Sequence, residues 1–188
     1  VQHHHAHLAA CLAEHRIVKQ GFEFDYTIRV ESKGDLVWNS ITTYLKQGRF
    51  GTEYDSSPRA DLIEPMNDGE TVSESMIPVD IGKRYARICS DYNPIHMSKL
   101  AAKLFGFKRD IAHAMWATAL SIGKAGYKNT DEPVRVDLGF KGPLFIESKS
   151  YIMRSVNKDS TRFNYYLAGN DKPCIVGKIT RVKKGSVL

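Results

Sequence analysis

The chain has 188 residues, of which 42% are hydrophobic and 26% are charged, and its formal net charge is +6. This length is typical of one domain, or of one domain with part of a second, and the composition excludes a disordered or fibrous chain. The longest uncharged run, from Ile111 to Gly123, has 13 residues and is too short to cross a bilayer, so we expect no membrane partner.

The basic residues and the cysteines do not indicate a nucleic-acid or zinc module. Lys and Arg occur in short, scattered clusters without interleaved aromatic residues, so a solvated basic surface is the simplest interpretation and attraction of a small phosphorylated ligand the second. Cys11, Cys89 and Cys174 lack CxxC spacing, which argues against a disulfide framework and a zinc site. The first residues also lack the pattern of a secretory signal. We therefore expect a cytoplasmic protein that binds no nucleic acid.

The chain begins with a histidine-rich segment, VQHHHAHLAACLAEH, at residues 1–15. It resembles a short stretch of the hydrogenase-maturation carbamoyltransferases, in which such histidines bind metal, but the resemblance ends at His15. A tag, a chance sequence or a natural segment leading into the next strand are the alternatives, and together we favour them over a metal site. We expect only adventitious binding of nickel or zinc, by His3, His4, His5 and His7.

The next segments alternate like β-strands and are followed by a polar stretch. Residues 22–32 and 35–45 are strand-like and are separated by a turn at Lys33-Gly34. No buried helix precedes them, and the chain has no initiator Met, so we expect it to begin inside a domain. Residues 52–76 are rich in Asp, Glu, Ser and Pro and are typical of a linker, whose bounds we place at 52–71.

The second half of the sequence predicts one long helix followed by a sheet. The helix is expected from Ile111 to about Ala125, with Asp110 as its N-cap and Gly126 as its stop, and its apolar residues predict burial on most sides. Four strand-like segments separated by turn signals then predict an antiparallel meander; they are residues 134–140, 144–155, 161–169 and 174–182. A curved antiparallel sheet wrapped around one long central helix is the hotdog arrangement, although the pattern also fits other α+β folds.

The short motif DYNPIH places Asp91 and His96 on either side of Asn93-Pro94. In a continuous helix these two side chains would point about 140° apart, but Pro94 prevents a continuous helix and predicts a turn that can bring them together. A carboxylate beside an imidazole can hold a water and exchange protons with it, which is general acid–base chemistry. The alternative is that Asp91 caps the next turn and His96 is a packed polar residue.

The stretch from Tyr85 to Trp116 closely resembles the signature of the MaoC-like dehydratases and (R)-specific enoyl-CoA hydratases. That signature runs S-G-D-x-N-P-I-H and then G-F-x-x-x-I-x-H-G-M, and the resemblance continues through VDLGFKGPLFI at residues 136–146. It covers about residue 72 to the end, and the first 50 residues more weakly resemble the last strands of the N-terminal repeat in double-hotdog members. The resemblance implies a partial hotdog repeat at 1–51, the linker at 52–71 and a hotdog domain at 72–188.

The resemblance also implies a function and the residues that perform it. The family hydrates trans-2-enoyl thioesters of CoA or acyl carrier protein reversibly to (3R)-3-hydroxyacyl thioesters, in metabolism of the fatty-acid type, without a metal or cofactor. Asp91 and His96 correspond to the residues that activate the water, and Asn93 to the one that helps position it. Two departures replace family glycines with Ser90 and Ala114. The residues expected beside the substrate are Asn93, Ser90, His113 and Ala114, and the expected backbone donors to the thioester oxygen are Ala112, His113 and Ala114.

Two further expectations concern an alternative role and assembly. The alternative to an active enzyme is a non-catalytic thioester-binding hotdog, or a subunit of a larger dehydratase assembly. An incomplete first repeat would leave a sheet edge open, and open edges tend to pair, so we expect a homodimer.

Overall fold

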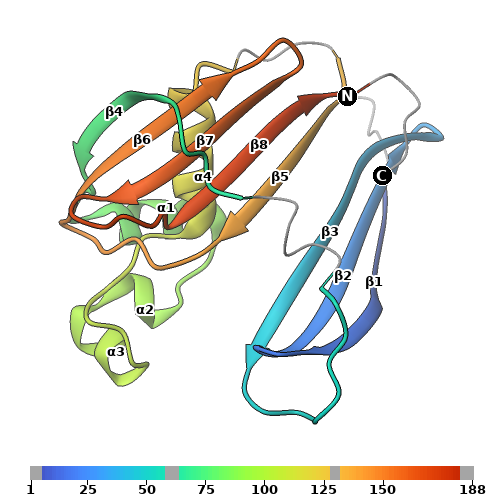
Figure 1. Ribbon diagram of the computed structural model, residues 1–188, viewed down its shortest axis with the longest axis horizontal. Helices are drawn as coiled ribbons and strands as arrows, with labels where there is room; N and C mark the ends of the chain where they lie inside the picture. Colours follow the sequence, from blue (N-terminus) through green and yellow to red (C-terminus); the bar gives the residue numbers. More distant parts are fainter. Residues whose placement is uncertain (1–5, 58–63, 128–131, 183–188) are drawn as a thin grey trace. The chain divides into compact units, whose positions relative to one another are not determined.

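The computed structural model of the chain describes residues 6–57, 64–127 and 132–182. These residues form two compact units, which meet in sequence at residues 60 and 61 (Figure 1). Within the described residues, no helix is both long and apolar enough to cross a membrane.

The first unit is a three-stranded antiparallel sheet in the order β1-β2-β3. β1 spans Ala6–Val18, β2 spans Gly21–Ser32 and β3 spans Asp35–Gln47, so the two predicted strands and the turn between them are confirmed. The histidine-rich start is itself part of a strand, because Ala6–Val18 pairs with β2 along its length. His7 is exposed on β1, and His3, His4 and His5 lie outside the described residues.

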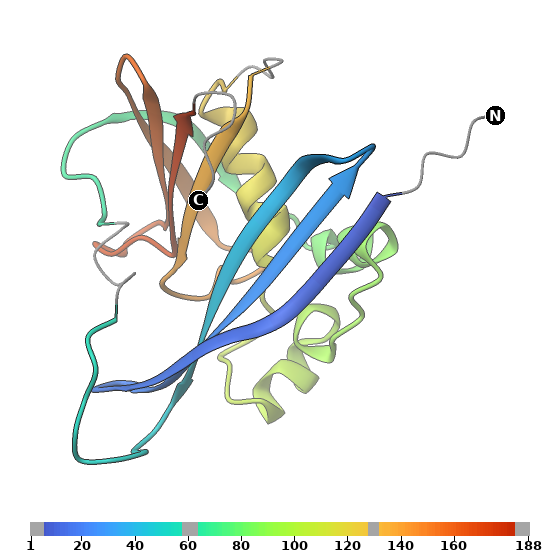
Figure 2. The ribbon, with the colours of Figure 1, turned by 90° about the vertical axis from the view of Figure 1, so that its right-hand side faces the viewer.

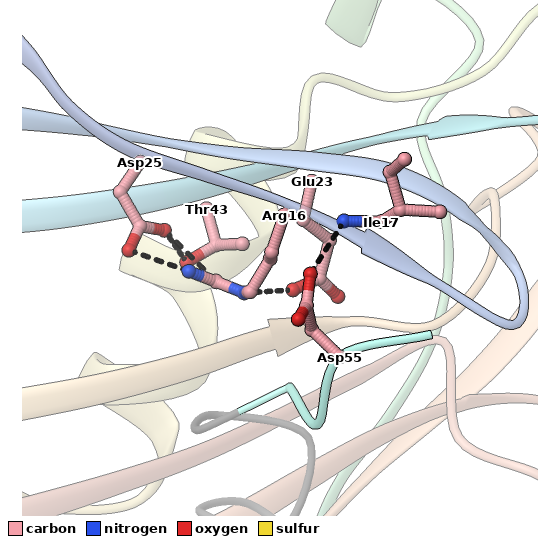
Figure 3. Close-up of polar contacts among 6 residues, drawn as sticks. All are labelled: Arg16, Ile17, Glu23, Asp25, Thr43 and Asp55. Atoms are coloured by element: carbon pink, nitrogen blue, oxygen red, sulfur yellow. Dashed lines mark hydrogen bonds and ion pairs between the residues drawn. The ribbon is translucent and has the colours of Figure 1, made fainter. Parts of the chain in front are cut away.

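A buried polar network holds the three strands together (Figure 3). Arg16 donates through Nε to Glu23 at 2.7 Å and through both terminal nitrogens to Asp25 at 3.1 Å each. Thr43 donates its hydroxyl to Asp25 at 2.5 Å, and the hydrogen bond to Asp25 raises the pKa of Arg16 above its ordinary value. Each strand therefore contributes at least one member to a network whose charges are almost completely buried.

The second unit is a five-stranded antiparallel sheet in the order β4-β6-β7-β8-β5, accompanied by four helices. The strands are β4 (Glu70–Met76), β5 (Val134–Phe140), β6 (Lys149–Val156), β7 (Ser160–Leu167) and β8 (Ile175–Arg181). The helices are α1 (Ile81–Cys89), α2 (Pro94–Met97), α3 (Lys99–Leu104) and α4 (Ala114–Lys124). Figure 2 shows α4 lying along one face of this sheet.

The sheet differs from the predicted meander in three ways. β6, β7 and β8 do form consecutive hairpins, but β5 pairs with β8 and not with the strand that follows it. Residues 144–148 were predicted as the start of a strand, yet β6 begins only at Lys149. β4 was not predicted as a strand, because its sequence ETVSESM has too few apolar residues; residues 70 and 71 fell in the predicted linker and residues 72–76 in the hotdog domain.

The central helix α4 begins later and is less buried than predicted. Asp110 is not its N-cap, because the helix begins at Ala114 and His113 occupies the capping position, whereas its end at Lys124, before Gly126, is confirmed. Only Ala117, Thr118 and Ser121 are fully buried on the helix, with both hydroxyls donating to backbone carbonyls one turn earlier. The helix thus packs on the core along one face.

Candidate active site

The motif DYNPIH forms a tight turn between two helices, as its proline predicts. α1 ends at Cys89, and Ser90 closes it in a left-handed conformation with φ 59°. Asn93 adopts the extended backbone required before a proline, and its side chain accepts a hydrogen bond from the N–H of Ile95 at 3.3 Å. The Oδ1 of Asp91 accepts from the N–H of Asn93 at 3.1 Å, which leaves Oδ2 for other partners. Asn93 therefore shapes the turn as the cap of α2.

The turn brings Asp91 and His96 together, as predicted. The Oδ2 of Asp91 lies 3.8 Å from the Nε2 of His96, which is too long for a direct hydrogen bond. A water oxygen can lie about 2.8 Å from both atoms at this separation. The side chain of Asp91 is 51% exposed and that of His96 is 10% exposed, so solvent reaches the pair from the carboxylate side.

A backbone carbonyl determines which nitrogen of His96 faces Asp91 as an acceptor. The Nδ1 of His96 lies 2.8 Å from the carbonyl oxygen of Ile111, which can only accept, so Nδ1 carries the proton. Burial lowers the pKa of His96 and the charge of His113 lowers it further, against opposing contributions from Ile111 and Asp91. His96 is therefore neutral near pH 7, with the lone pair of Nε2 available to a water.

His113 packs against both members of the pair. Its Nε2 donates to the backbone carbonyl of Asp91 at 3.0 Å, and its ring stacks on that of His96 with centroids 3.8 Å apart. Its opposite nitrogen, Nδ1, is buried without a hydrogen-bond partner. The ring of Tyr85, on α1, packs against the ring of His113, with ring centroids 5.1 Å apart. His113 thus connects the start of α4 to the turn that carries Asp91.

The structure corrects the expected set of backbone donors at the start of α4. The N–H of Ala112 already donates to the carbonyl of Leu144 at 2.8 Å, so Ala112 is not available to a thioester oxygen. The cause is a pairing of two segments that are distant in sequence: Ile111 forms a β-bridge with Phe145, and the helix begins three residues later than predicted. His113 and Ala114 remain candidates, because N–H groups at a helix start have no intrahelical partner.

Two features that support the site were not predicted from the sequence. A Cβ at Gly82, inside α1, would overlap the carbonyl of His96, so glycine allows α1 and α2 to approach closely. The carbonyl of Ile111 fixes the tautomer of His96 across 15 residues of sequence. Gly82 itself was the sequence signal for the first feature, whereas no local pattern indicates the second.

Asp91, His96 and His113 also form a possible metal-ligand group, since each offers one ligand atom within 4.8 Å of the others. In each imidazole one nitrogen is hydrogen-bonded to a backbone carbonyl and the other is free. Metal-ligating histidines show the same arrangement, so these hydrogen bonds do not distinguish a metal from a water.

Comparison with known proteins identifies the second unit. Residues 63–149 match the family model of the MaoC like domain. The chain is 32% identical over 135 residues to 3-hydroxyacyl-thioester dehydratase X of Mycobacterium tuberculosis, which is 72% of this chain and 46% of that protein. The chain therefore spans less than half of this curated relative.

Solved structures agree on the fold. The crystal structure of HtdX from Mycobacterium tuberculosis has a TM-score of 0.73 at 22% identity, covering 93% of this chain and 68% of that one. A MaoC-like dehydratase from Phytophthora capsici has a TM-score of 0.76 at 15% identity, covering 96% of this chain and 66% of that one. The α+β hotdog prediction is confirmed, and the chain carries a MaoC-like dehydratase domain.

Proposed function

We propose that this chain catalyses the reversible hydration of trans-2-enoyl thioesters to (3R)-3-hydroxyacyl thioesters. The observation that carries the proposal is the placement of Asp91 and His96, whose free oxygen and free nitrogen lie 3.8 Å apart. Both atoms are acceptors when His96 is neutral, so a water between them would direct its two hydrogens toward the pair and an oxygen lone pair away from it. The similarity to a 3-hydroxyacyl-thioester dehydratase supports the same reaction.

The reaction requires one proton to leave the water and one to reach the substrate. The water oxygen bonds to C3 of the enoyl thioester, and one water proton passes to the Asp91–His96 pair. The pair returns a proton to C2, so H and OH add across the double bond, and dehydration is the same sequence in reverse. Because the two side chains lie only 3.8 Å apart, we assign the proton to the pair and not to either residue.

Charge that develops on the thioester oxygen during addition needs hydrogen-bond donors. The N–H groups of His113 and Ala114 at the start of α4 would supply them, and the helix dipole favours negative charge at this end. Ser90 and Ala114 would lie beside the substrate, where the family has glycine. Ala114 adds a methyl group but retains its N–H.

The experiment that tests this function follows the loss of enoyl-thioester absorbance when the chain meets crotonyl-CoA or a longer enoyl-CoA in water. Turnover to the (3R) product supports the proposal. Binding of the thioester without turnover would instead support a non-catalytic thioester-binding domain.

We also propose a homodimer and a reducing, cytoplasmic location. β4 and β5 form the two edges of the five-stranded sheet, and an unpaired edge favours association with a second copy. Cys11, Cys89 and Cys174 are all free thiols, and two of them are exposed, which fits a reducing compartment. Light scattering tests the dimer: a monodisperse monomer with full hydratase activity would contradict it.

A further inference from the structure

The positive charge of this chain is concentrated beside the candidate active site. Residues 81–109, from the start of α1 to five residues past the end of α3, contain seven Lys or Arg residues and one acidic residue, Asp91. The other residues contain 20 Lys or Arg and 20 Asp or Glu. In sequence, this segment therefore carries the whole excess of +6, although three of its cations, Arg84, Lys99 and Arg109, form ion pairs with acidic residues that lie outside it.

The same segment has the most exposed large apolar side chains of the described chain. Leu104 is 82% exposed, Ile88 is 79% exposed and Leu100 is 72% exposed. Phe105, which caps the end of α3, is 64% exposed. Single exposed apolar residues are ordinary, but a cluster beside unpaired charges is typical of an interaction surface.

The exposed residues of α3 form two parallel rows. At about 100° per residue, Lys99 and Lys103 align one turn apart, and Leu100 and Leu104 form a second row beside them. Ala102, on the opposite side, is completely buried and faces the rest of the unit. We call Lys99, Leu100, Lys103, Leu104 and Phe105 the α3 face.

Of the two lysines of the α3 face, Lys99 is held by an ion pair and Lys103 is not. Lys99 forms an ion pair of 2.6 Å with Glu147, which also binds Arg109 at 2.6 Å. Neither Lys103 nor the exposed Lys108 forms an ion pair with any residue in the described ranges. Figure 1 shows α2 and α3 beyond the end of the five-stranded sheet. The ion pair of Lys99 therefore fixes α3 on this unit, and the charges of Lys103 and Lys108 are available to a partner protein.

We propose that the α3 face docks an acidic carrier protein that delivers the acyl thioester to Asp91 and His96. The inference rests on the proposed hydratase function and specifies how its substrate arrives. Acidic side chains of the partner would pair with Lys103 of the α3 face and with Lys108, three residues after Phe105. Its apolar residues would cover Leu100, Leu104 and Phe105. Electrostatic complementarity of this kind accelerates encounter and orients the partner.

Two other anionic ligands fit the α3 face less well. The phosphates of a free CoA need donors that converge in a concave site. The lysines of α3 instead lie in a row on an exposed helix, beside solvent-exposed leucines. A membrane surface favours a long amphipathic helix, and α3 has six residues. A small acidic protein with an apolar stripe can pair with the lysine row and cover the leucine row at the same time.

The test compares the same enoyl chain on acyl carrier protein and on CoA, using the full chain and the variant Lys103→Glu/Lys108→Glu. We expect the ratio of kcat/KM for the carrier-protein substrate to kcat/KM for the CoA substrate to fall about tenfold in this variant, mainly through KM. Lys141→Glu/Lys172→Glu is the matched control, since it reverses two exposed charges elsewhere, and it should leave the ratio within about twofold. Leu100→Ser/Leu104→Ser should lower the ratio as well.

A direct binding measurement separates this inference from the hydratase proposal. Titration calorimetry with unloaded acyl carrier protein should show binding to the wild type that weakens with salt and is lost in Lys103→Glu/Lys108→Glu. Such binding supports docking even if neither thioester turns over, which would contradict only the hydratase. An unchanged ratio would overturn the docking proposal, as would an equal loss for both substrates or binding to anionic vesicles without binding to the carrier protein.

Discussion

The imidazole rings of His96 and His113 stack with centroids 3.8 Å apart and an interplanar angle of 25°. Through this contact, and through the hydrogen bond from His113 to the Asp91 carbonyl, the start of α4 supports both members of the candidate catalytic pair. Burial, and to a smaller extent the charge of His113, lower the pKa of His96. The arrangement therefore keeps His96 neutral and fixes its position.

The rate of the reaction should fall as acid protonates His96. Burial lowers the pKa of His96 below its ordinary value near 6.5, so Nε2 stays unprotonated through neutral pH. We expect kcat/KM to be constant around pH 7 and to fall only below pH 6.5. A steady-state pH profile measures this limb, and a limb centred above pH 6.5 would contradict a buried, neutral base.

The lowered pKa of His96 also predicts how the free energy of unfolding depends on pH. A histidine with a lowered pKa in the folded state binds its proton first in the unfolded chain, so stability should fall as pH drops below about 6.5 and level off below the folded pKa. Urea denaturation at several pH values tests this. His96→Gln should remove this part of the pH dependence.

His113 should act as a positioning residue whose loss changes the pH profile. His113→Phe retains a ring beside His96 but removes the donor to the Asp91 carbonyl, so kcat should fall about tenfold, with a smaller change in KM. Because the charge of His113 lowers the pKa of His96, the acid limb should also move to higher pH. His113→Gln can still donate a hydrogen bond and should restore part of kcat. An unmoved acid limb in His113→Phe would show that His113 has only a structural role.

Ser90 occupies a backbone conformation that favours glycine. Its φ of 59° lies in the left-handed region, where a side chain costs about 1–2 kcal/mol. Ser90→Gly removes this strain but makes the unfolded chain more flexible, so the free energy of unfolding should change by less than about 1 kcal/mol. Ser90→Val should lower it by about 1–2 kcal/mol, because a β-branched residue is least tolerated there. Equal stability of the Gly and Val variants, measured by urea denaturation, would be inconsistent with this conformation.

The buried network of the first unit should be far more sensitive than an exposed ion pair. Arg16→Met leaves the carboxylates of Glu23 and Asp25 buried without their cation and should lower the free energy of unfolding by about 3 kcal/mol. Arg29→Met is the matched control on the next strand. Its pair with Glu31 is exposed, and the loss should be below about 1 kcal/mol. Similar losses in the two variants would mean that the network does not stabilise this unit.

Local sequence patterns predicted the strands whose apolar and polar residues alternate clearly and the turn that contains a proline. Alternation identified β5, β7 and β8 to within about two residues, and Pro94 correctly indicated the turn that joins Asp91 to His96. β1 was not predicted, because its histidines and alanines do not give the alternation of apolar and polar residues that is typical of a strand. β4 was missed because Ser and Glu dominate it.

The predicted start of α4 and the predicted donor Ala112 were wrong because of contacts between residues that are far apart in the sequence. Asp110 and Ile111 have the local pattern of a helix start, but Ile111 bridges to Phe145 and Ala112 bonds to Leu144, more than 30 residues away. These contacts move the start of α4 to Ala114 and remove Ala112 from the set of free donors. A cap pattern reports only local preference and cannot reveal such a competing pairing.

The most direct test of the account is the hydration rate of an enoyl-CoA by Asp91→Asn, His96→Ala and the double variant. We expect each single change to lower kcat/KM by about 10²- to 10⁴-fold, and the double change to cost little more, because the two residues act on one water. Asp80→Asn, an exposed carboxylate at the start of α1, is the control and should retain the wild-type rate. A double variant with wild-type kcat/KM would contradict the assignment of Asp91 and His96 as the catalytic pair.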